Sequence, residues 1–154
     1  HLYGVRAVLP GMIERGEGYL VHTASAAGLL TQIGDLPYSV TKHAVVGLAE
    51  WLAITYGDAG VRVSCICPQY VRTAMTTGGS AAAARSTMTE EKMSSVADVL
   101  EPSDVAAALL DAMGEERFLV LPHPEVHDYF VRRATDTDRW LRGMRRLQQG
   151  WRAP

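Results

Sequence analysis

Residues 37–67, PYSVTKHAVVGLAEWLAITYGDAGVRVSCIC, combine a long helical pattern with a buried strand and decide the fold class. Pro37 can occupy a first helical turn without losing a hydrogen bond, and the apolar periodicity continues until Gly57 and Gly60 interrupt it. The run VRVSCIC that follows is short, apolar and rich in valine, which is typical of a buried strand. A helix that leads into a buried strand is one unit of an α/β fold.

The same alternation extends on both sides of this stretch. Tyr19–Ala24, YLVHTA, predicts a strand covered on both faces, and a polar loop is expected from Ser25 to about Leu36. The remaining predicted elements are a helix over residues 2–15, a helix over residues 101–114 and a strand over residues 117–121. This order favours a doubly wound parallel sheet with helices on both faces and right-handed crossovers.

Length and composition predict one soluble domain over residues 1–154, with a sizeable core because 47% of the residues are hydrophobic. The 15 basic and 17 acidic residues nearly cancel, so neither nucleic acid nor an anionic membrane is an expected partner, and a small neutral or polar ligand fits better. Cys65 and Cys67 are one residue apart without room for an ordinary bridge, which favours buried structural cysteines in a reducing, cytoplasmic setting and no metal site.

Two segments near the C-terminus have a distinct composition. Residues 73–102 are rich in small residues and methionine and are expected to form a flexible substrate flap, with a solvated linker as the alternative. An amphipathic helix over about residues 136–149 is expected to pack on the domain or on a partner subunit, and an anionic surface is the alternative. His123 and His127 have helical spacing, but no third metal ligand accompanies them.

Ser25, Tyr38 and Lys42 form the constellation that can carry chemistry. Tyr38 and Lys42 are four residues apart on the predicted helix and share one face, while Ser25 follows a strand at the edge where α/β sheets bind ligands. A phenol ordinarily has a pKa near ~10, and an ammonium group ~5 Å away stabilises the phenolate by roughly 3 kcal/mol. The pair is therefore suited to acid/base chemistry; the alternative is a surface lysine beside a half-buried tyrosine on an ordinary amphipathic helix.

Three ordered segments resemble the second half of the short-chain dehydrogenase/reductases: YLVHTASAAGL, PYSVTKHAVVGLAEWLA and VRVSCICPQYVRTAM. The resemblance implies that Ser25 orients a carbonyl group, that Tyr38 is the acid/base, and that Lys42 binds the nicotinamide ribose and tunes Tyr38. It also implies NAD or NADP as cofactor. The resemblance further suggests cofactor contacts at Tyr38, Lys42, Pro68, Val71 and Thr73, and substrate contacts at Ser25, Tyr38, Gln69 and Tyr70.

Departures from the family pattern qualify this interpretation. His1 stands where many members have a catalytic asparagine, and Gln69 replaces the usual glycine. Nothing resembles the glycine-rich loop that holds the pyrophosphate, so a Rossmann-like fold without its first strands is expected, and this fragment alone should be inactive. The helix from Pro37 looks like the family's dimer-forming helix, so a homodimer or homotetramer is expected for the complete protein.

The predicted function is that of an NAD(P)-dependent oxidoreductase that interconverts a secondary alcohol and a ketone or aldehyde by hydride transfer. Two alternatives remain at this point. A noncatalytic relative would keep the fold and use its surface for protein association, and an epimerase or dehydratase would use the same tyrosine and lysine for transient oxidation. Neither the substrate nor the choice between NAD and NADP can be read from these residues, because the ribose-reading segment is not among them.

Overall fold

The structure, a computed structural model, describes residues 1–74, 76 and 98–152. Its elements in chain order are α1 (Leu2–Arg15), β1 (Gly18–Thr23), α2 (Ala27–Leu30), α3 (Leu36–Tyr56), the 3-10 turn η1 (Gly57–Ala59), β2 (Val61–Ile66), α5 (Pro102–Gly114), β3 (Leu119–Val120), α6 (Glu125–Thr135) and α7 (Thr137–Arg152). Among these elements, no helix combines the length and hydropathy that crossing a bilayer requires.

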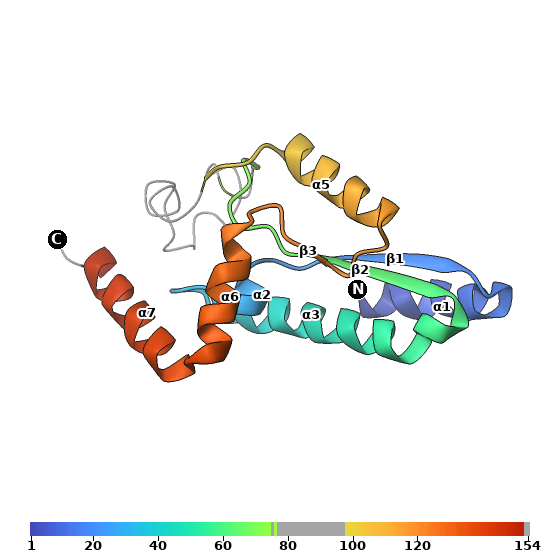
Figure 1. Ribbon diagram of the computed structural model, residues 1–154, viewed down its shortest axis with the longest axis horizontal. Helices are drawn as coiled ribbons and strands as arrows, with labels where there is room; N and C mark the ends of the chain where they lie inside the picture. Colours follow the sequence, from blue (N-terminus) through green and yellow to red (C-terminus); the bar gives the residue numbers. More distant parts are fainter. Residues whose placement is uncertain (75, 77–97, 153–154) are drawn as a thin grey trace.

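The three strands form a parallel sheet in the order β1-β2-β3. Parallel neighbours need a crossover connection, and α3 supplies it between β1 and β2 while α5 lies between β2 and β3. Helices α1 and α3 lie on one face of the sheet and α5 lies on the other (Figure 1). The predicted parallel sheet with helices on both faces is confirmed, and the fold is Rossmann-like.

Most of the core lies between the sheet and the pair α1 and α3. One apolar side of α3 is buried at Val46, Ala49 and Leu52, at the three-residue spacing that keeps side chains on one face. The other buried members of this cluster come mainly from α1 and the strands: Val5, Leu9, Leu20, Val61, Val63, Cys65 and Cys67. A smaller cluster of Ile66, Ala112 and Val120 lies on the α5 side.

Strand β1 is covered on one face only in the described part of the chain, so the prediction of two covered faces is wrong there. Leu20 and His22 are buried, whereas Val21 and Thr23 on the opposite face are exposed. The reason is the position of α5, which contacts β2 and β3. The pattern of β1 is therefore the alternation of a half-covered strand.

The region predicted as a polar loop, Ser25 to Leu36, contains the short buried helix α2. Its small residues explain the difference, because Gly28 brings α2 against the backbone of α3: a Cβ at this position would lie 2.6 Å from the carbonyl oxygen of Lys42. Leu29 is also buried. The sequence ASAAGLL therefore forms a tight helical turn that fixes the start of α3.

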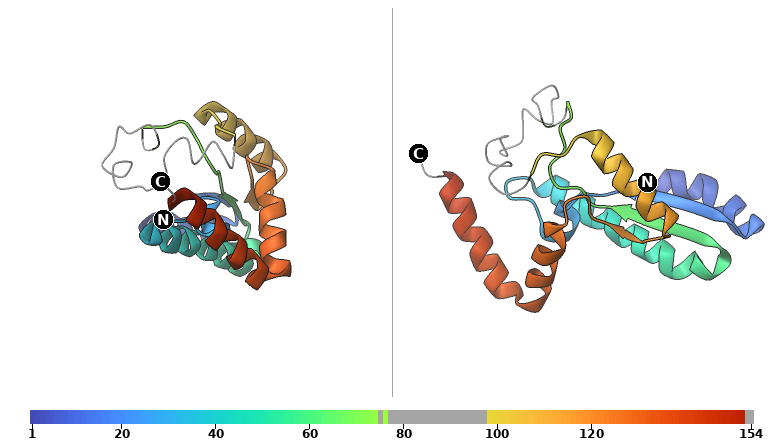
Figure 2. Two further views of the ribbon diagram at one scale, coloured as in Figure 1. Left: turned by 90° about the vertical axis from the view of Figure 1, so that its left-hand side faces the viewer. Right: turned by 45° about the horizontal axis from the view of Figure 1, so that its top comes forward.

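Helices α6 and α7 form a hairpin that follows β3. Val126 of α6 is fully buried in the main core, and the guanidinium group of Arg133 donates a hydrogen bond to the carbonyl oxygen of Leu29. At the joint, Asp136 Oδ1 accepts a hydrogen bond of 2.9 Å from the backbone N–H of Arg139. From there α7 extends away from the sheet (Figure 2). Helix α6 was not predicted from the sequence.

Candidate active site

Ser25 lies directly after β1 and is held by the loop that follows β2. Its Oγ accepts a hydrogen bond of 3.2 Å from the backbone N–H of Ala27 and is 3.4 Å from the carbonyl oxygen of Pro68. The backbone N–H of Ala26 donates to the same oxygen at 2.9 Å. Ser25 is thus fixed at the carboxyl ends of two neighbouring strands, where open α/β sheets bind ligands.

Tyr38 and Lys42 come from the first turns of α3. The helix begins at a defined residue, because Asp35 Oδ1 accepts a hydrogen bond of 3.0 Å from the backbone N–H of Tyr38. Lys42 Nζ donates to the carbonyl oxygen of Thr23 at 3.1 Å and lies 5.5 Å from the centroid of the Tyr38 ring. The structure therefore brings the predicted tyrosine and lysine together beside the end of β1.

The ammonium group of Lys42 lies in a partly desolvated position. Burial lowers the pKa of Lys42, and the thiols of Cys67 and Cys65 act in the opposite direction. Within the described residues Thr23 is the hydrogen-bond acceptor of this ammonium group, which has three N–H donors. Two donors can therefore serve a ligand.

The two cysteines are buried beneath this region. Their sulfur atoms are 4.0 Å apart and both thiols are free, as expected for structural cysteines. The contact with Cys65 lowers the pKa of the Cys67 thiol, while the same contact raises the pKa of Cys65. Full burial keeps both thiols from external reagents.

The loop after β2 is positioned by a buried histidine. His123 is 2% exposed; its Nδ1 accepts a hydrogen bond of 3.1 Å from the backbone N–H of Gln69, and its Nε2 lies 3.1 Å from the carbonyl oxygen of Asp98. Both contacts fit the tautomer that carries hydrogen on Nε2. His127, its neighbour in the sequence motif, is exposed. Among the described residues, no group of three or more His, Cys, Asp or Glu side chains could hold a metal ion.

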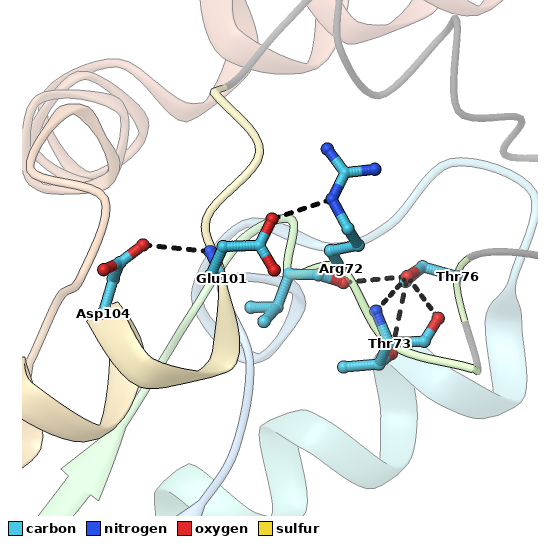
Figure 3. Close-up of polar contacts among 6 residues, drawn as sticks. Arg72, Thr73, Thr76, Glu101 and Asp104 are labelled. Atoms are coloured by element: carbon cyan, nitrogen blue, oxygen red, sulfur yellow. Dashed lines mark hydrogen bonds and ion pairs between the residues drawn. The ribbon is translucent and has the colours of Figure 1, made fainter.

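Val71 and Thr73, predicted as cofactor contacts, are engaged by Thr76. The Oγ1 of Thr76 lies 2.8 Å from the carbonyl oxygen of Val71 and accepts a hydrogen bond of 2.9 Å from the backbone N–H of Thr73 (Figure 3). A carboxamide that accepts from the backbone N–H of Thr73 would have to replace the Thr76 hydroxyl, whereas the carbonyl oxygen of Val71 can accept a second hydrogen bond. Their role as cofactor contacts stays a prediction.

The two ends of the predicted flap, residues 73–102, lie side by side. The backbone N–H of Arg72 donates to the carbonyl oxygen of Leu100 at 2.9 Å. The Nε of Arg72 donates to Glu101 Oε1 at 2.8 Å (Figure 3). Asp104 accepts from the backbone N–H of Glu101 at 3.1 Å and so begins α5. Most of the predicted flap, at residues 75 and 77–97, lies outside the described residues.

A cavity of about 320 Å³ opens beside Ser25. One wall contains Ser25, Gln69 and the loop that precedes α3. The opposite wall comes from the hairpin and consists of Tyr129, Arg132, Trp140, Met144, Leu147 and Trp151. Tyr38 and Lys42 are not among the lining residues, and Tyr70, predicted as a substrate contact, is 2% exposed and does not line the cavity either.

A more open hollow of about 560 Å³ beside α5 contains none of the predicted site residues. The smaller cavity is therefore the candidate site. Its hairpin wall was missed in the sequence, where the helical spacing of Trp140, Met144, Leu147 and Trp151 was interpreted as packing. The spacing does not show what the stripe faces. The fold shows this, because it places the stripe opposite Ser25, more than one hundred residues earlier in the chain.

His1 and His22 lie in contact on the α1 side of β1. Their Nδ1 atoms are 3.2 Å apart, and the Nε2 of His22 is buried without a hydrogen-bond partner among the described residues. Burial lowers the pKa of His22. His1, which departs from the family's asparagine, is thus a neighbour of the buried His22 ring.

Comparison with known proteins decides the family. The profile of the short chain dehydrogenases matches residues 1–84, which is more than half of the chain. The chain belongs to the short-chain dehydrogenase family. All three segments on which the resemblance rested begin within that range, so the family assignment made from them is confirmed.

Individual members of the family show how much of a complete protein is present. The chain is 46% identical over 71 residues to the oxidoreductase UcpA of Escherichia coli K12, covering 46% of this chain and 27% of that protein. It is 32% identical over 126 residues to the 1-deoxy-11-beta-hydroxypentalenate dehydrogenase of Streptomyces exfoliatus, covering 81% of this chain and 42% of that one.

A short-chain dehydrogenase/reductase from Burkholderia phymatum, solved in complex with NAD, has a similar fold. The TM-score is 0.71 with 29% identity, over 89% of this chain and 54% of that chain. The chain therefore spans about half or less of the length of these relatives.

Proposed function

We propose that this chain provides the catalytic residues of an NAD(P)-dependent oxidoreductase that interconverts a secondary alcohol and a carbonyl compound. The observation that carries the proposal is the placement of Lys42 Nζ beside the Tyr38 ring, 5.5 Å from its centroid, while the same nitrogen is anchored to Thr23 at the end of β1. Family membership supports it, since the relatives named above are an oxidoreductase and a dehydrogenase.

In the direction of reduction, Tyr38 donates its proton to the carbonyl oxygen of the substrate. The Lys42 ammonium group stabilises the phenolate that this transfer leaves. The contact of 3.4 Å from Ser25 Oγ to Pro68 is long for a hydroxyl donor, so this hydroxyl can turn toward the substrate oxygen and hold it. Oxidation of the alcohol reverses these proton transfers.

A nicotinamide nucleotide, NAD or NADP, supplies or accepts the hydride when it is bound. The residues fit such a group at Lys42, whose remaining N–H donors can hold ribose hydroxyls at the carboxyl end of β1. The Burkholderia phymatum relative was solved with NAD, which supports the same class of cofactor. Pro68, Val71 and Thr73 are proposed as the backbone that faces the nicotinamide carboxamide.

The direct test replaces Tyr38 by phenylalanine in the full-length protein. Tyr38→Phe should reduce kcat for carbonyl reduction by at least about 10²-fold, the usual contribution of a positioned acid or base. Tyr56→Phe is the matched control because Tyr56 lies on the same helix, about 27 Å away along its axis. Unchanged turnover in Tyr38→Phe would refute the catalytic role. Tight cofactor binding without turnover of any alcohol or ketone would favour a noncatalytic relative instead.

A further inference from the structure

Helix α7 presents a stripe of large apolar side chains to the candidate cavity. We name it the α7 stripe: Trp140, Met144, Leu147 and Trp151, spaced four, three and four residues apart and hence on one face of the helix. All four side chains are partly buried and line the cavity. Leu141, on another face of the same helix, is 51% exposed and does not line it.

The stripe is held at a fixed place by the base of the hairpin. Trp140 packs near Tyr129 of α6, with ring centroids 6.3 Å apart and an interplanar angle of 41°. Helix α6 is itself anchored, since Val126 is fully buried in the core. Beyond this base, α7 diverges from α6 and from the sheet (Figure 2), and the space beside its stripe is the cavity.

The opposite wall of the cavity is polar at one end. Ser25 lies there with its hydroxyl, and the Oε1 of Gln69 is buried without a hydrogen-bond partner among the described residues. A buried acceptor without a donor is unfavourable. Ser25 therefore marks the polar end of the cavity, opposite the apolar stripe.

We infer that this cavity selects substrates with a compact ring-bearing group, which packs against the α7 stripe while the reacting oxygen lies at the Ser25 end. The inference deepens the proposed function and rests on it for the reaction at the oxygen. A volume of about 320 Å³ is near the lower end of the ~300–1,000 Å³ found for small-molecule pockets. It suits an aryl alkyl ketone or the matching alcohol rather than a long chain.

The kinetic test compares acetophenone with butanone in the full-length protein. Met144→Ala and Leu147→Ala should each lower kcat/KM for acetophenone at least about 10-fold, the effect of a lost apolar contact in a specificity pocket, and change that for butanone by less than about threefold. Leu147→Trp, which fills the cavity, should have the same selective effect. Leu141→Ala is the matched control. Equal losses on both ketones in these variants would overturn the inference.

A binding measurement separates this inference from the proposed reaction. In a Trp51→Phe background of the full-length protein, the tryptophans that this sequence retains, Trp140 and Trp151, both line the cavity. Acetophenone should change the protein fluorescence saturably, and Met144→Ala should weaken that binding at least about 10-fold. Saturable binding without turnover would refute the proposed function and support the cavity. If acetophenone caused no saturable change in fluorescence, the inference would be overturned. It would also be overturned if Met144→Ala dissociated the oligomer while acetophenone binding stayed unchanged, because the stripe would then be a subunit contact.

Discussion

Gly28 controls the position of the proposed catalytic helix, and its replacement by alanine tests this. A Cβ at Gly28 would lie 2.6 Å from the carbonyl oxygen of Lys42 and 2.9 Å from its carbonyl carbon, whereas ordinary contact begins at 3.4 Å. Both partners are backbone atoms of regular helices, so α3 must move by the difference between 2.6 and 3.4 Å, about 0.8 Å. Overpacking of this kind destabilises a protein by ~1–3 kcal/mol.

The same displacement should reach the proposed active site. Tyr38 and Lys42 lie on the part of α3 that Gly28 contacts, and a misplacement of ~1 Å at catalytic groups can reduce the rate ~10²-fold. We therefore expect Gly28→Ala to lower the melting temperature of the full-length protein by ~2–4 °C for each kcal/mol lost, and to lower kcat ten- to a hundredfold on the scale of such displacements.

Thermal unfolding followed by circular dichroism and steady-state kinetics measure the two effects. Gly47→Ala is the matched control, since Gly47 lies on the same helix and a Cβ there meets nothing within 4 Å. That change should be neutral or stabilise by up to ~1 kcal/mol, because alanine is the better helix former. A Gly28→Ala variant with wild-type melting temperature and wild-type kcat would refute the proposed role of this contact.

Two further predictions concern stability. Gly60 has φ 81°, and an added Cβ would collide with the carbonyl oxygen of Gly16. Gly60→Ala should therefore lower the free energy of unfolding, measured in urea, by more than ~3 kcal/mol. A loss below ~1 kcal/mol would contradict the clash. Burial lowers the pKa of His22 in the folded chain below its ordinary value of 6.5. Below about pH 6.5 the unfolded chain therefore binds more protons at His22 than the folded chain does, and the free energy of unfolding falls as the pH is lowered. His22→Leu should lose less stability than wild type between pH 7.5 and 5; equal acid losses would count against this account.

The order of elements could be predicted because each main helix and strand has its own periodicity. The helix over residues 2–15 and the long helix from Pro37 coincide with α1 and α3, apart from one residue at the start of α3 where Asp35 caps it. The strands were expected at residues 19–24, 61–67 and 117–121, and they lie at 18–23, 61–66 and 119–120. Strands end where pairing ends, and pairing depends on the neighbouring strand rather than on local composition.

Elements that depend on tertiary contact were harder to predict. Helix α2 has four residues and forms because Gly28 packs on α3, which a local pattern does not reveal. Helix α6 was not predicted, because PHPEVH was considered only for the spacing of His123 and His127, for which no third metal ligand was found. In the structure His123 instead holds the backbone of Gln69 and that of Asp98, so its buried position reflects loop support.

In the candidate site too, some residues could be predicted from local sequence and others depend on tertiary contacts. Tyr38 and Lys42 could be paired from their spacing, because residues four apart on a helix share a face in any fold. The apolar wall opposite Ser25 could not be predicted from the sequence. A helical stripe of Trp, Met and Leu is typical both of core packing and of ligand contact, and only the space beside it distinguishes the two. The proximity of Tyr38 and Lys42 was therefore predictable from the sequence, whereas the cavity wall depends on the fold.

The proposed catalytic residues and the proposed specificity stripe are supported by different parts of the fold, and this predicts how variants should differ. The backbone of Tyr38 is held by its hydrogen bond to the Asp35 side chain, and the backbone of Lys42 is held by the close approach of Gly28. The α7 stripe is held mainly at its Trp140 end. A displaced α3 should consequently impair every substrate by a similar factor, whereas a change in the stripe should impair substrates in proportion to the apolar group that they carry. If Gly28→Ala discriminated between acetophenone and butanone as strongly as Met144→Ala does, the two parts would not be separable and the assignment of specificity to α7 would fail.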